Sequence, residues 1–315
     1  MVLIPKVAHP ELINQFRPIS LCNTLYKLLS RIIVQRLKPF TTEVINPCQA
    51  GFVPGRCTSD NIIIVQEAIR TLISRRGRTR HVALKLDLEK AYDRLEWPFI
   101  RETLEFFQVP STLIALIMNM ISSTHFHIIW NGSPLPEVIP SQGIRQGDPL
   151  SPYLFILCLE RLSIKLIEAI RNKSIHPLNF RTGVHLSHLF FADNIFLFTR
   201  ATAKDCTNLN CLLLEFCTMS GQIMSATKSK TWFSPRTPKW IKEQVAGILG
   251  LPTTDRIGSY LGTPIFSTRR TASSYRYLVD NIRKRIEGWQ AKYLSMASRA
   301  TLIKALVTSI PIYTM

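Results

Sequence analysis

Two aspartates lie at the ends of expected strands, where their side chains could bind divalent cations. Alternating apolar residues over 82–86 predict a half-buried strand that Asp87 closes, and Asp193 lies in the turn of a hairpin expected over 184–199. If these strands are neighbours in one antiparallel sheet, the two carboxylates meet at its edge. Paired carboxylates supply the oxygen ligands that two Mg²⁺ ions need to promote phosphoryl transfer. Each aspartate taken singly is more typical of a strand end or an ordinary hairpin turn.

The elements around these aspartates alternate between helices and short strands. Apolar residues recur at helical spacing in seven segments, which are 23–37, 58–73, 98–109, 111–121, 154–170, 207–220 and 273–291. Strands are expected at 82–86, 184–191 and 195–199, the last two joined by a tight turn at 192–194.

Polar residues at the starts of two helices predict their N-caps. Ser59 or Asp60 is expected to cap the helix over 58–73. Asp148 is expected to cap the helix that follows it, with Pro149 at the first helical position. A turn-rich run over 131–152 leads into this second helix.

Composition narrows the class of protein. The chain has 315 residues and 46% hydrophobic residues, which is a globular composition, and its apolar runs are too short to cross a bilayer. The seven cysteines are odd in number and include no CxxC pair, which argues against a disulfide framework and a zinc ribbon. We therefore expect an intracellular protein with free thiols and no membrane partner, and not a secreted, fibrous or membrane-spanning one.

The net charge of +18 is concentrated toward the C-terminus. Between Lys228 and Met315 there are 15 basic and 4 acidic residues, a net charge of +11 for this segment. Such asymmetry is typical of a protein that binds a polyanion through its phosphates. A solvated surface that keeps the protein soluble would give the same charge, so charge alone leaves both interpretations open.

A series of sequence blocks resembles one protein family. In chain order they are LIPK at 3–6, FRPISL at 16–21, QAGFVPGR at 49–56, LDLEKAYDR at 86–94, GIRQGDPLSP at 143–152, FADN at 191–194, SGQ at 220–222, KSK at 228–230, YLG at 260–262 and the segment 289–315. These blocks resemble the reverse transcriptases of non-LTR (LINE-type) retrotransposons, most closely those of plants. Six or more blocks in the same order make chance an inadequate explanation.

The resemblance implies a metal site and a deoxynucleotide site. Asp87 and Asp193 would hold two Mg²⁺ ions, or Mn²⁺ in their place, with the backbone carbonyl of Leu88 as a further ligand. Tyr92 stands where the family has an aromatic steric gate that excludes a ribose 2′-OH. From the residues alone, Tyr92 is as consistent with a core tyrosine at a helix start.

Four further residues would contact the nucleotide or the template. The resemblance assigns Lys6 and Arg17 to the triphosphate, and Gln146 and Gly147 to the border between nucleotide and template. Taken alone, either cation is more typical of a solvated surface, and the Gln146-Gly147 pair is also what a turn before a capped helix carries.

Two more assignments concern the leaving group and the nucleic acid. Lys228 would lie near the leaving pyrophosphate, although Lys230 two residues later makes this choice weak. Arg283, Lys284 and Arg285 lie on an expected basic helix, with Trp289 four positions after Arg285, and this helix would contact the phosphates of the primer–template duplex. A solvated helix face with the tryptophan in a core is the alternative.

Asn194 departs from the family, which has Phe-Ala-Asp-Asp where this chain has Phe191-Ala-Asp-Asn194. The amide offers one neutral oxygen in place of a carboxylate, so weaker metal binding and impaired polymerisation are expected. The polymerases of non-segmented negative-strand RNA viruses carry Asp-Asn at this place, so the replacement by itself does not require a complete loss of activity.

The sequence as a whole predicts an α+β right-hand polymerase with an antiparallel-sheet palm. Fingers are expected over 1–85 and lacking their earlier part, a palm over 86–234, and a basic helical thumb with a partial connection over 235–315. The predicted activity is RNA-directed DNA polymerisation from an RNA template, a DNA primer and deoxynucleoside triphosphates. The alternative is a catalytically silent relic of a degraded element that binds RNA or RNA–DNA hybrid. If family behaviour holds, the protein works in the nucleus, and the endonuclease of an intact element is supplied separately.

Overall fold

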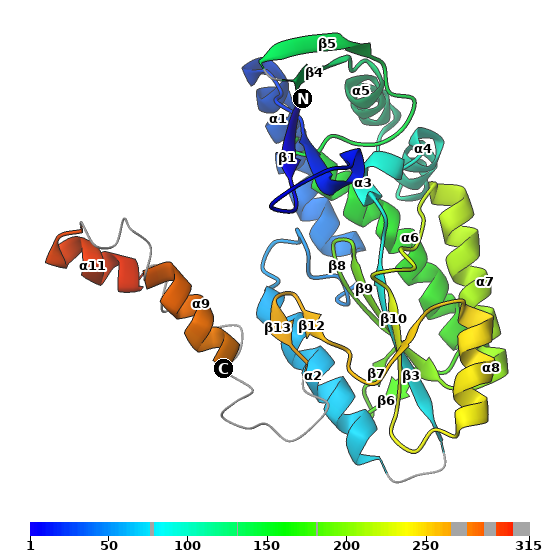
Figure 1. Ribbon diagram of the computed structural model, residues 1–315. Coiled ribbons are helices and arrows are strands. Elements are labelled where there is room, and N and C mark those ends of the chain that lie inside the picture. The colour runs from blue at the N-terminus through cyan, green and yellow to red at the C-terminus, as the bar shows by residue number, and fades with distance from the viewer. Residues whose placement is uncertain (76–78, 131, 181, 266–275, 287–293, 305–315) are drawn as a thin grey trace.

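A five-stranded sheet forms the centre of the fold, in a computed structural model that describes all residues except 76–78, 131, 181, 266–275, 287–293 and 305–315 (Figure 1). Its strand order is β11-β10-β3-β9-β8. The strands are β3 (His81–Asp87), β8 (His188–Phe191), β9 (Asn194–Arg200), β10 (Lys230–Phe233) and β11 (Thr253–Thr254). All neighbours are antiparallel except the β10–β11 pair. The expected strand ending at Asp87 and the expected hairpin turn around Asp193 are therefore confirmed, whereas the expected strand over 184–191 is divided, since only 188–191 pairs with β9.

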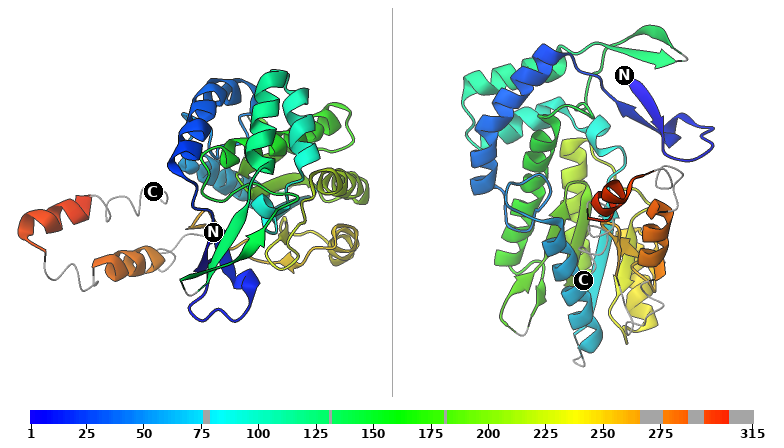
Figure 2. Two further views of the ribbon diagram at one scale, coloured as in Figure 1. Left: turned by 90° about the horizontal axis from the view of Figure 1, so that it is seen from above. Right: turned by 90° about the vertical axis from the view of Figure 1, so that its left-hand side faces the viewer.

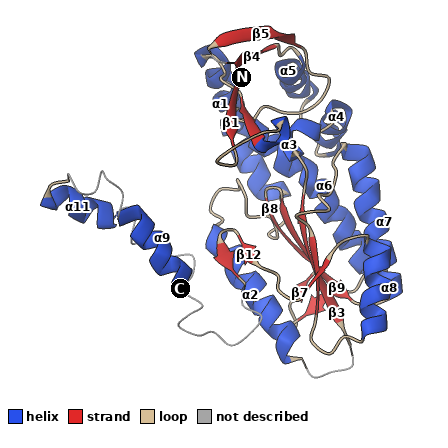
Figure 3. Ribbon diagram, in the orientation of Figure 1, coloured by secondary structure: helices blue, strands red, loops and turns tan. Residues whose placement is uncertain are grey.

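Helices and short hairpins cover the two faces of this sheet (Figures 1 and 3). The β3 side chains of Val82, Leu84 and Leu86 belong to the larger core, which also contains residues of α1 (Thr24–Val44), α4 (Trp97–Phe106), α5 (Ser111–Ser122), α6 (Ser151–Arg171), α7 (Ala203–Ser220) and α8 (Lys239–Leu249). Ala83 lies in a second core with α2 (Thr58–Ser74), the hairpin of β6 (Leu178–Asn179) and β7 (His185–Leu186), and the hairpin of β12 (Ser259–Tyr260) and β13 (Thr263–Pro264). This alternation along β3 is what a strand with both faces covered requires.

Two joined hairpins lie above the end of the sheet that carries Asp87 and Asp193 (Figure 2). The first comprises β1 (Val2–Pro5) and β2 (Phe16–Ile19), connected through the short helix η1 (Ile13–Gln15). The second comprises β4 (Phe126–Trp130) and β5 (Ser133–Val138), and it meets the first where Ile129 N–H donates to the Met1 carbonyl at 3.1 Å. The sequence predicted only turns over 131–152, because β5 is exposed along its whole length and contains two prolines, so it shows no alternating pattern.

The expected helices are present, but both predicted N-caps are wrong. Cys57 is the N-cap of α2, and Asp60 instead accepts a hydrogen bond from the Cys57 backbone N–H at 3.3 Å. Helix α6 begins at Ser151, with Leu150 as its N-cap, so neither Asp148 nor Pro149 starts it. The buried Asp148 carboxylate instead accepts hydrogen bonds from Tyr26, from Ser30 and from the Leu150 N–H. It thereby ties α1 to the start of α6, a role that local sequence does not reveal.

The expected domain boundaries remain predictions, and the sheet crosses both of them. The 85/86 boundary falls within β3, and β11 joins the sheet from beyond residue 234. Helices α9 (Arg276–Ile286) and α11 (Met296–Leu302) lie apart from the sheet (Figures 1 and 2), and the expected end of the basic helix at 291 lies outside the described residues. No helix of the described part of the chain is long and apolar enough to cross a membrane.

Candidate active site

Asp87 and Asp193 meet at one edge of the sheet, as the strand pattern predicted. Asp87 ends β3 directly opposite Asn194, the first residue of β9, and Asp193 precedes Asn194 in the turn. Burial raises the pKa of the Asp193 carboxyl, and the negative charge of Asp87 raises it further, whereas Lys228 and Arg17 oppose this shift. The two negative charges repel each other, and a bound cation would relieve this repulsion.

The turn that carries Asp193 is held by a buried glutamine. Ala192 has a left-handed φ of 51°, which is strained for a residue with a side chain. The side-chain oxygen of Gln49 accepts hydrogen bonds from the N–H groups of Ala192 at 3.2 Å and Gly51 at 2.8 Å. A Cβ at Gly51 would lie 2.6 Å from the Ala192 nitrogen, so only glycine fits there. The block at 49–56 resembles the family in sequence, but local sequence gives no sign of this role for Gln49.

Asp87 is held from the segment that precedes β10. Its N–H donates to Ser229 Oγ at 3.2 Å, and its carbonyl accepts from the Ser225 N–H at 2.8 Å. Lys228 Nζ lies 3.4 Å from Asp87 Oδ1. Lys230, the other candidate lysine, lies on β10 opposite Lys85. Of these two lysines, Lys228 is thus the one that reaches the paired carboxylates.

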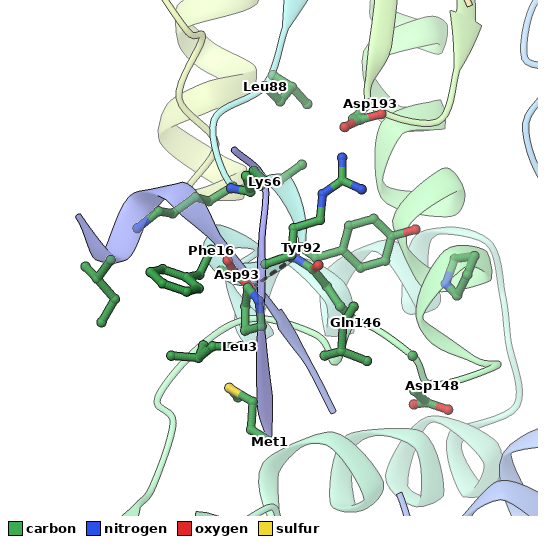
Figure 4. Close-up of a pocket in the computed structure, with 18 of the residues that line it drawn as sticks. Met1, Leu3, Lys6, Phe16, Leu88, Tyr92, Asp93, Gln146, Asp148 and Asp193 are labelled. Carbon is green, nitrogen blue, oxygen red and sulfur yellow. Dashed lines mark hydrogen bonds between the residues drawn. The ribbon is translucent and has the colours of Figure 1, made fainter. Parts of the chain in front are cut away.

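A cleft of about 740 Å³ opens over the two aspartates (Figure 4). Strands β1 and β2 form one wall, and the end of β3 and the β8–β9 turn form another. The predicted residues that line it are Lys6, Arg17, Asp87, Leu88, Tyr92, Gln146, Gly147, Asp193, Asn194 and Lys228. The structure therefore brings together every candidate residue named from the sequence except the three on the basic helix.

Tyr92 lies in this cleft with its ring stacked on Phe155 of α6. The ring centroids are 5.1 Å apart and the planes differ by 14°. Burial raises the pKa of the Tyr92 hydroxyl above its ordinary value, and the nearby charge of Asp193 adds to the shift, so the hydroxyl stays protonated. The ring packs against the core and also lines the cleft, and its role as a steric gate stays a prediction.

The Gln146–Gly147 turn lines the cleft and packs against Ser20, the residue that follows β2. The Ser20 N–H donates to the Gln146 carbonyl at 2.8 Å. Gly147 has a φ of +107°, and a Cβ there would lie 2.9 Å from the Ser20 carbonyl oxygen. The Gln146 side chain donates to Asp93 Oδ1 at 3.5 Å (Figure 4). Asp93 was missed from the sequence, although it lies six positions after Asp87 and lines the same cleft.

Positive charge converges on the cleft from the β1–β2 hairpin. Lys6 follows β1, where its N–H donates to the Gln15 carbonyl at 2.8 Å, and Arg17 lies on β2. Burial lowers the pKa of Lys6, and the cations Lys228, Arg17 and Lys90 lower it further. These cations repel one another, and this repulsion favours binding of a polyanionic ligand in the space between them.

Comparison with known proteins assigns the family. The family model of reverse transcriptase (RNA-dependent DNA polymerase) matches residues 4–278. The chain belongs to this reverse transcriptase family. It is 28% identical over 98% of its length to the Xenopus laevis transposon TX1 uncharacterized 149 kDa protein, of which it covers 23%. It is 30% identical over 73% of its length to the Pol polyprotein of the Drosophila melanogaster type-2 retrotransposable element R2DM, of which it covers 21%.

The reverse transcriptase fold is also found among solved structures. The match to a Candida tropicalis telomerase structure covers 91% of this chain and 45% of the telomerase chain, with a TM-score of 0.51 and 10% sequence identity. The expectation of a non-LTR reverse transcriptase with a right-hand polymerase fold is thus confirmed. The chain spans about a quarter of the length of the curated relatives it matches, so activities and partners of those longer proteins are not transferred with the family.

The donor set of this reverse transcriptase fits a hard cation. Asp87 and Asp193 offer carboxylate oxygens. Leu88 lies opposite Met224 in an antiparallel bridge, and the hydrogen bonds of this bridge are made by Asp87 and Glu89. The Leu88 carbonyl is therefore directed away from Met224. No group of three His, Cys, Asp or Glu side chains suited to a metal occurs among the described residues, because Asn194 occupies the third position. The site therefore has two charged ligands where the family motif has three.

The described part of the basic helix, α9, does not line this cleft. Arg283 and Lys284 are exposed on α9, which lies apart from the sheet (Figure 1), and the side chain of Arg285 and Trp289 lie outside the described residues. A contact of this helix with nucleic acid stays a prediction.

Proposed function

We propose that this chain is an RNA-directed DNA polymerase domain whose chemistry is weakened by Asn194. The observation that carries the proposal is the convergence of Asp87 and Asp193 in a cleft that fingers cations also line. Reverse transcriptases use divalent metal ions, and the family points to an RNA template as partner. The finer assignments of two Mg²⁺ ions, a DNA primer and deoxynucleoside triphosphates belong to this proposal.

The reaction extends a primer by one nucleotide. The primer 3′ oxygen attacks the α-phosphorus, the bond from that phosphorus to the β-phosphate oxygen breaks, and the hydroxyl proton leaves to solvent while pyrophosphate departs. Divalent ions bound by Asp87, Asp193 and the Leu88 carbonyl would lower the pKa of the hydroxyl and neutralise developing charge. Lys6 and Arg17 would bind the triphosphate, and Lys228 would stabilise the pyrophosphate.

Two residues would set the geometry and the sugar specificity. The Tyr92 ring, fixed by its stack on Phe155, would lie beneath the incoming sugar and exclude a 2′-OH. Gln146, oriented by Asp93 and by the Ser20 contact of its carbonyl, would border the nucleotide. Both proposals follow from the lining of the cleft and await a functional test.

A catalytically silent nucleic-acid-binding protein is the second candidate. Asn194 favours it, because its amide donates to Asp193 Oδ1 at 3.2 Å and so occupies an oxygen that a metal ion would need. The cationic cleft would still bind RNA or RNA–DNA hybrid in such a protein.

Primer extension separates the two candidates. The full chain and its Asn194→Asp form are assayed on an RNA template with a DNA primer, in Mg²⁺ and in Mn²⁺, with Asp87→Asn as the inactive control. We expect weak extension by the natural chain and at least tenfold faster extension by Asn194→Asp. Absence of extension in both forms, with salt-sensitive hybrid binding retained, would establish the silent candidate and reject the polymerase. Full activity of the natural chain would reject the proposed impairment.

A further inference from the structure

A second cationic pocket lies at the opposite end of β3 from the catalytic aspartates. It has a volume of about 170 Å³ and is lined by Arg75, Thr79, His81, Pro177, Asn179 and Arg200. His81 begins β3 and pairs directly with Arg200 of β9, whereas Asp87 ends the same strand. Six residue steps at roughly 3.3 Å separate the two ends by about 20 Å.

Among the described residues, the two arginines of this pocket have no acidic partner. Neither Arg75 nor Arg200 forms an ion pair with a carboxylate in the described part of the chain, and no aspartate or glutamate lines the pocket. Arg75 donates instead to the Asn179 carbonyl at 2.7 Å and to His81 Nε2 at 3.1 Å. The nearby acid Asp205 is buried outside the pocket lining, where it pairs with His176 at 3.1 Å.

His81 is neutral, so it does not compensate the positive charge of the two arginines. Its side chain is 2% exposed, and since a guanidinium can only donate, Nε2 must be the accepting nitrogen in its contact with Arg75. Burial, followed by the charges of Arg75 and Arg200, lowers the pKa of His81 to about 4. Two guanidinium groups around a neutral, buried ring leave an excess of positive charge that a bound oxyanion would neutralise.

We propose that this pocket binds a phosphate group, supplied by an RNA strand that extends beyond the catalytic cleft. Planar guanidinium groups match the oxygens of phosphate by paired hydrogen bonds. The face of β3 that carries both His81 and Asp87 is covered between them by α2 and the β12–β13 hairpin, so the RNA strand would run over the outside of these elements. At about 3.4 Å per nucleotide, at least about six nucleotides are needed to reach from the catalytic edge to the pocket.

Variants of the two arginines test the site by binding, without relying on polymerase activity. The full chain is titrated with hybrids whose template overhang is either 2 or 15 nucleotides, at several salt concentrations. Arg200→Gln is the main variant, because its guanidinium makes no hydrogen bond to another described residue, and the hydrogen bond that Arg200 accepts from Cys206 is made by its backbone carbonyl. Arg75→Gln is the second variant. Arg70→Gln is the matched control, since Arg70 is an exposed arginine of α2 that pairs only with Glu67 at 4.0 Å.

We expect Arg200→Gln and Arg75→Gln to weaken binding of the long-overhang hybrid by about threefold or more. The slope of the logarithm of its binding constant against the logarithm of salt concentration should become shallower by the equivalent of about one phosphate contact. The short-overhang hybrid and the Arg70→Gln control should bind as the natural chain does. The natural chain is also mixed with inorganic phosphate, and broadening of the ³¹P signal reports binding. If Arg200→Gln abolishes this broadening but leaves hybrid binding unchanged, the pocket binds free phosphate and not an RNA strand. If Arg200→Gln and Arg75→Gln weaken neither hybrid binding nor phosphate binding more than Arg70→Gln does, the proposal is overturned. Thermal unfolding of each variant excludes misfolding as the cause, and Arg200→Lys retains part of the binding if charge is what matters.

Discussion

The Asn194 side-chain amide donates a hydrogen bond to Oδ1 of Asp193, 3.2 Å away. An aspartate at position 194 could not donate this bond when ionised, and it would add a second negative charge beside Asp193. The replacement therefore changes the site in two ways, since it removes one anionic ligand and engages another through its amide. Both changes weaken the binding of divalent cations.

Asn194→Asp should bind Mn²⁺ about tenfold more tightly than the natural chain, because the number of charged ligands at the site sets its affinity. Free Mn²⁺ in a titration followed by electron paramagnetic resonance measures this directly. Asp193→Asn serves as the control and should bind more weakly than the natural chain. Equal affinities of the Asn194→Asp form and the natural chain would show that residue 194 does not contact the ion.

Lys228→Ala should tighten Mn²⁺ binding and yet slow primer extension in the Asn194→Asp form. The ammonium lies 3.4 Å from Asp87 Oδ1, where it competes with a cation, whereas during the reaction it would stabilise the leaving pyrophosphate. Because this lysine is well exposed, we expect only a few-fold change in metal affinity. Lys230→Ala is the matched control and should change neither property. Parallel effects of the two substitutions would remove Lys228 from the site.

Tyr92→Val should lower the preference for deoxynucleotides over ribonucleotides by about tenfold or more in the Asn194→Asp form. Loss of the ring that stacks on Phe155 opens the space beneath the sugar, whereas Tyr92→Phe keeps the ring and should keep the preference. The ratio of kcat/KM for the two nucleotides is the measurement. A preference that survives in Tyr92→Val would make Tyr92 a core residue only.

Much of this site was predictable from local sequence, and the part that was not depends on contacts between distant segments. Alternating apolar residues placed Asp87 at a strand end, and the ordered family blocks paired it with Asp193. Gln49 could not be assigned, because its role follows from the φ of Ala192, far away in sequence. The same holds for Asp148, since its proximity to Pro149 suggested a local cap, whereas its partners Tyr26 and Ser30 lie on α1.

Gln49→Ala should loosen the turn that carries Asp193. It removes the acceptor of the Ala192 and Gly51 N–H groups, and a buried unpaired donor costs about 1–3 kcal/mol. Faster amide exchange over 190–194 should accompany the loss of stability. Adding Ala192→Gly should recover part of it, since glycine adopts a positive φ without strain. Unchanged exchange in Gln49→Ala would show that the turn holds itself.

A buried carboxyl on α6 lies next to the loop that carries Gln49. Glu160 is 2% exposed, its Oε2 has no hydrogen-bond partner among the described residues, and burial raises its pKa to about 7. Hydrogen bonds from Ser163 and the Asn46 backbone, together with the charge of Arg56, oppose this shift. Arg56 itself donates to backbone carbonyls of the loop, at Ile45, Asn46 and Gln49. The folded protein therefore binds the Glu160 proton more tightly than the unfolded chain does.

Glu160→Gln should consequently remove a loss of stability that the natural chain suffers as pH rises. The pKa of Glu160 is about 4.5 unfolded and about 7 folded, so the folded state holds more protons in this window and its stability falls from pH 4.5 to pH 7. The shift corresponds to roughly 3 kcal/mol at most, present in full above pH 7. Chemical denaturation of both proteins from pH 5 to pH 8 should show the variant gaining relative to the natural chain across this range, whereas Glu168→Gln, an exposed glutamate of the same helix, should show no such trend. A difference between Glu160→Gln and the natural chain that stays constant with pH would mean that the carboxyl is ionised throughout, with Arg56 close enough to hold its charge.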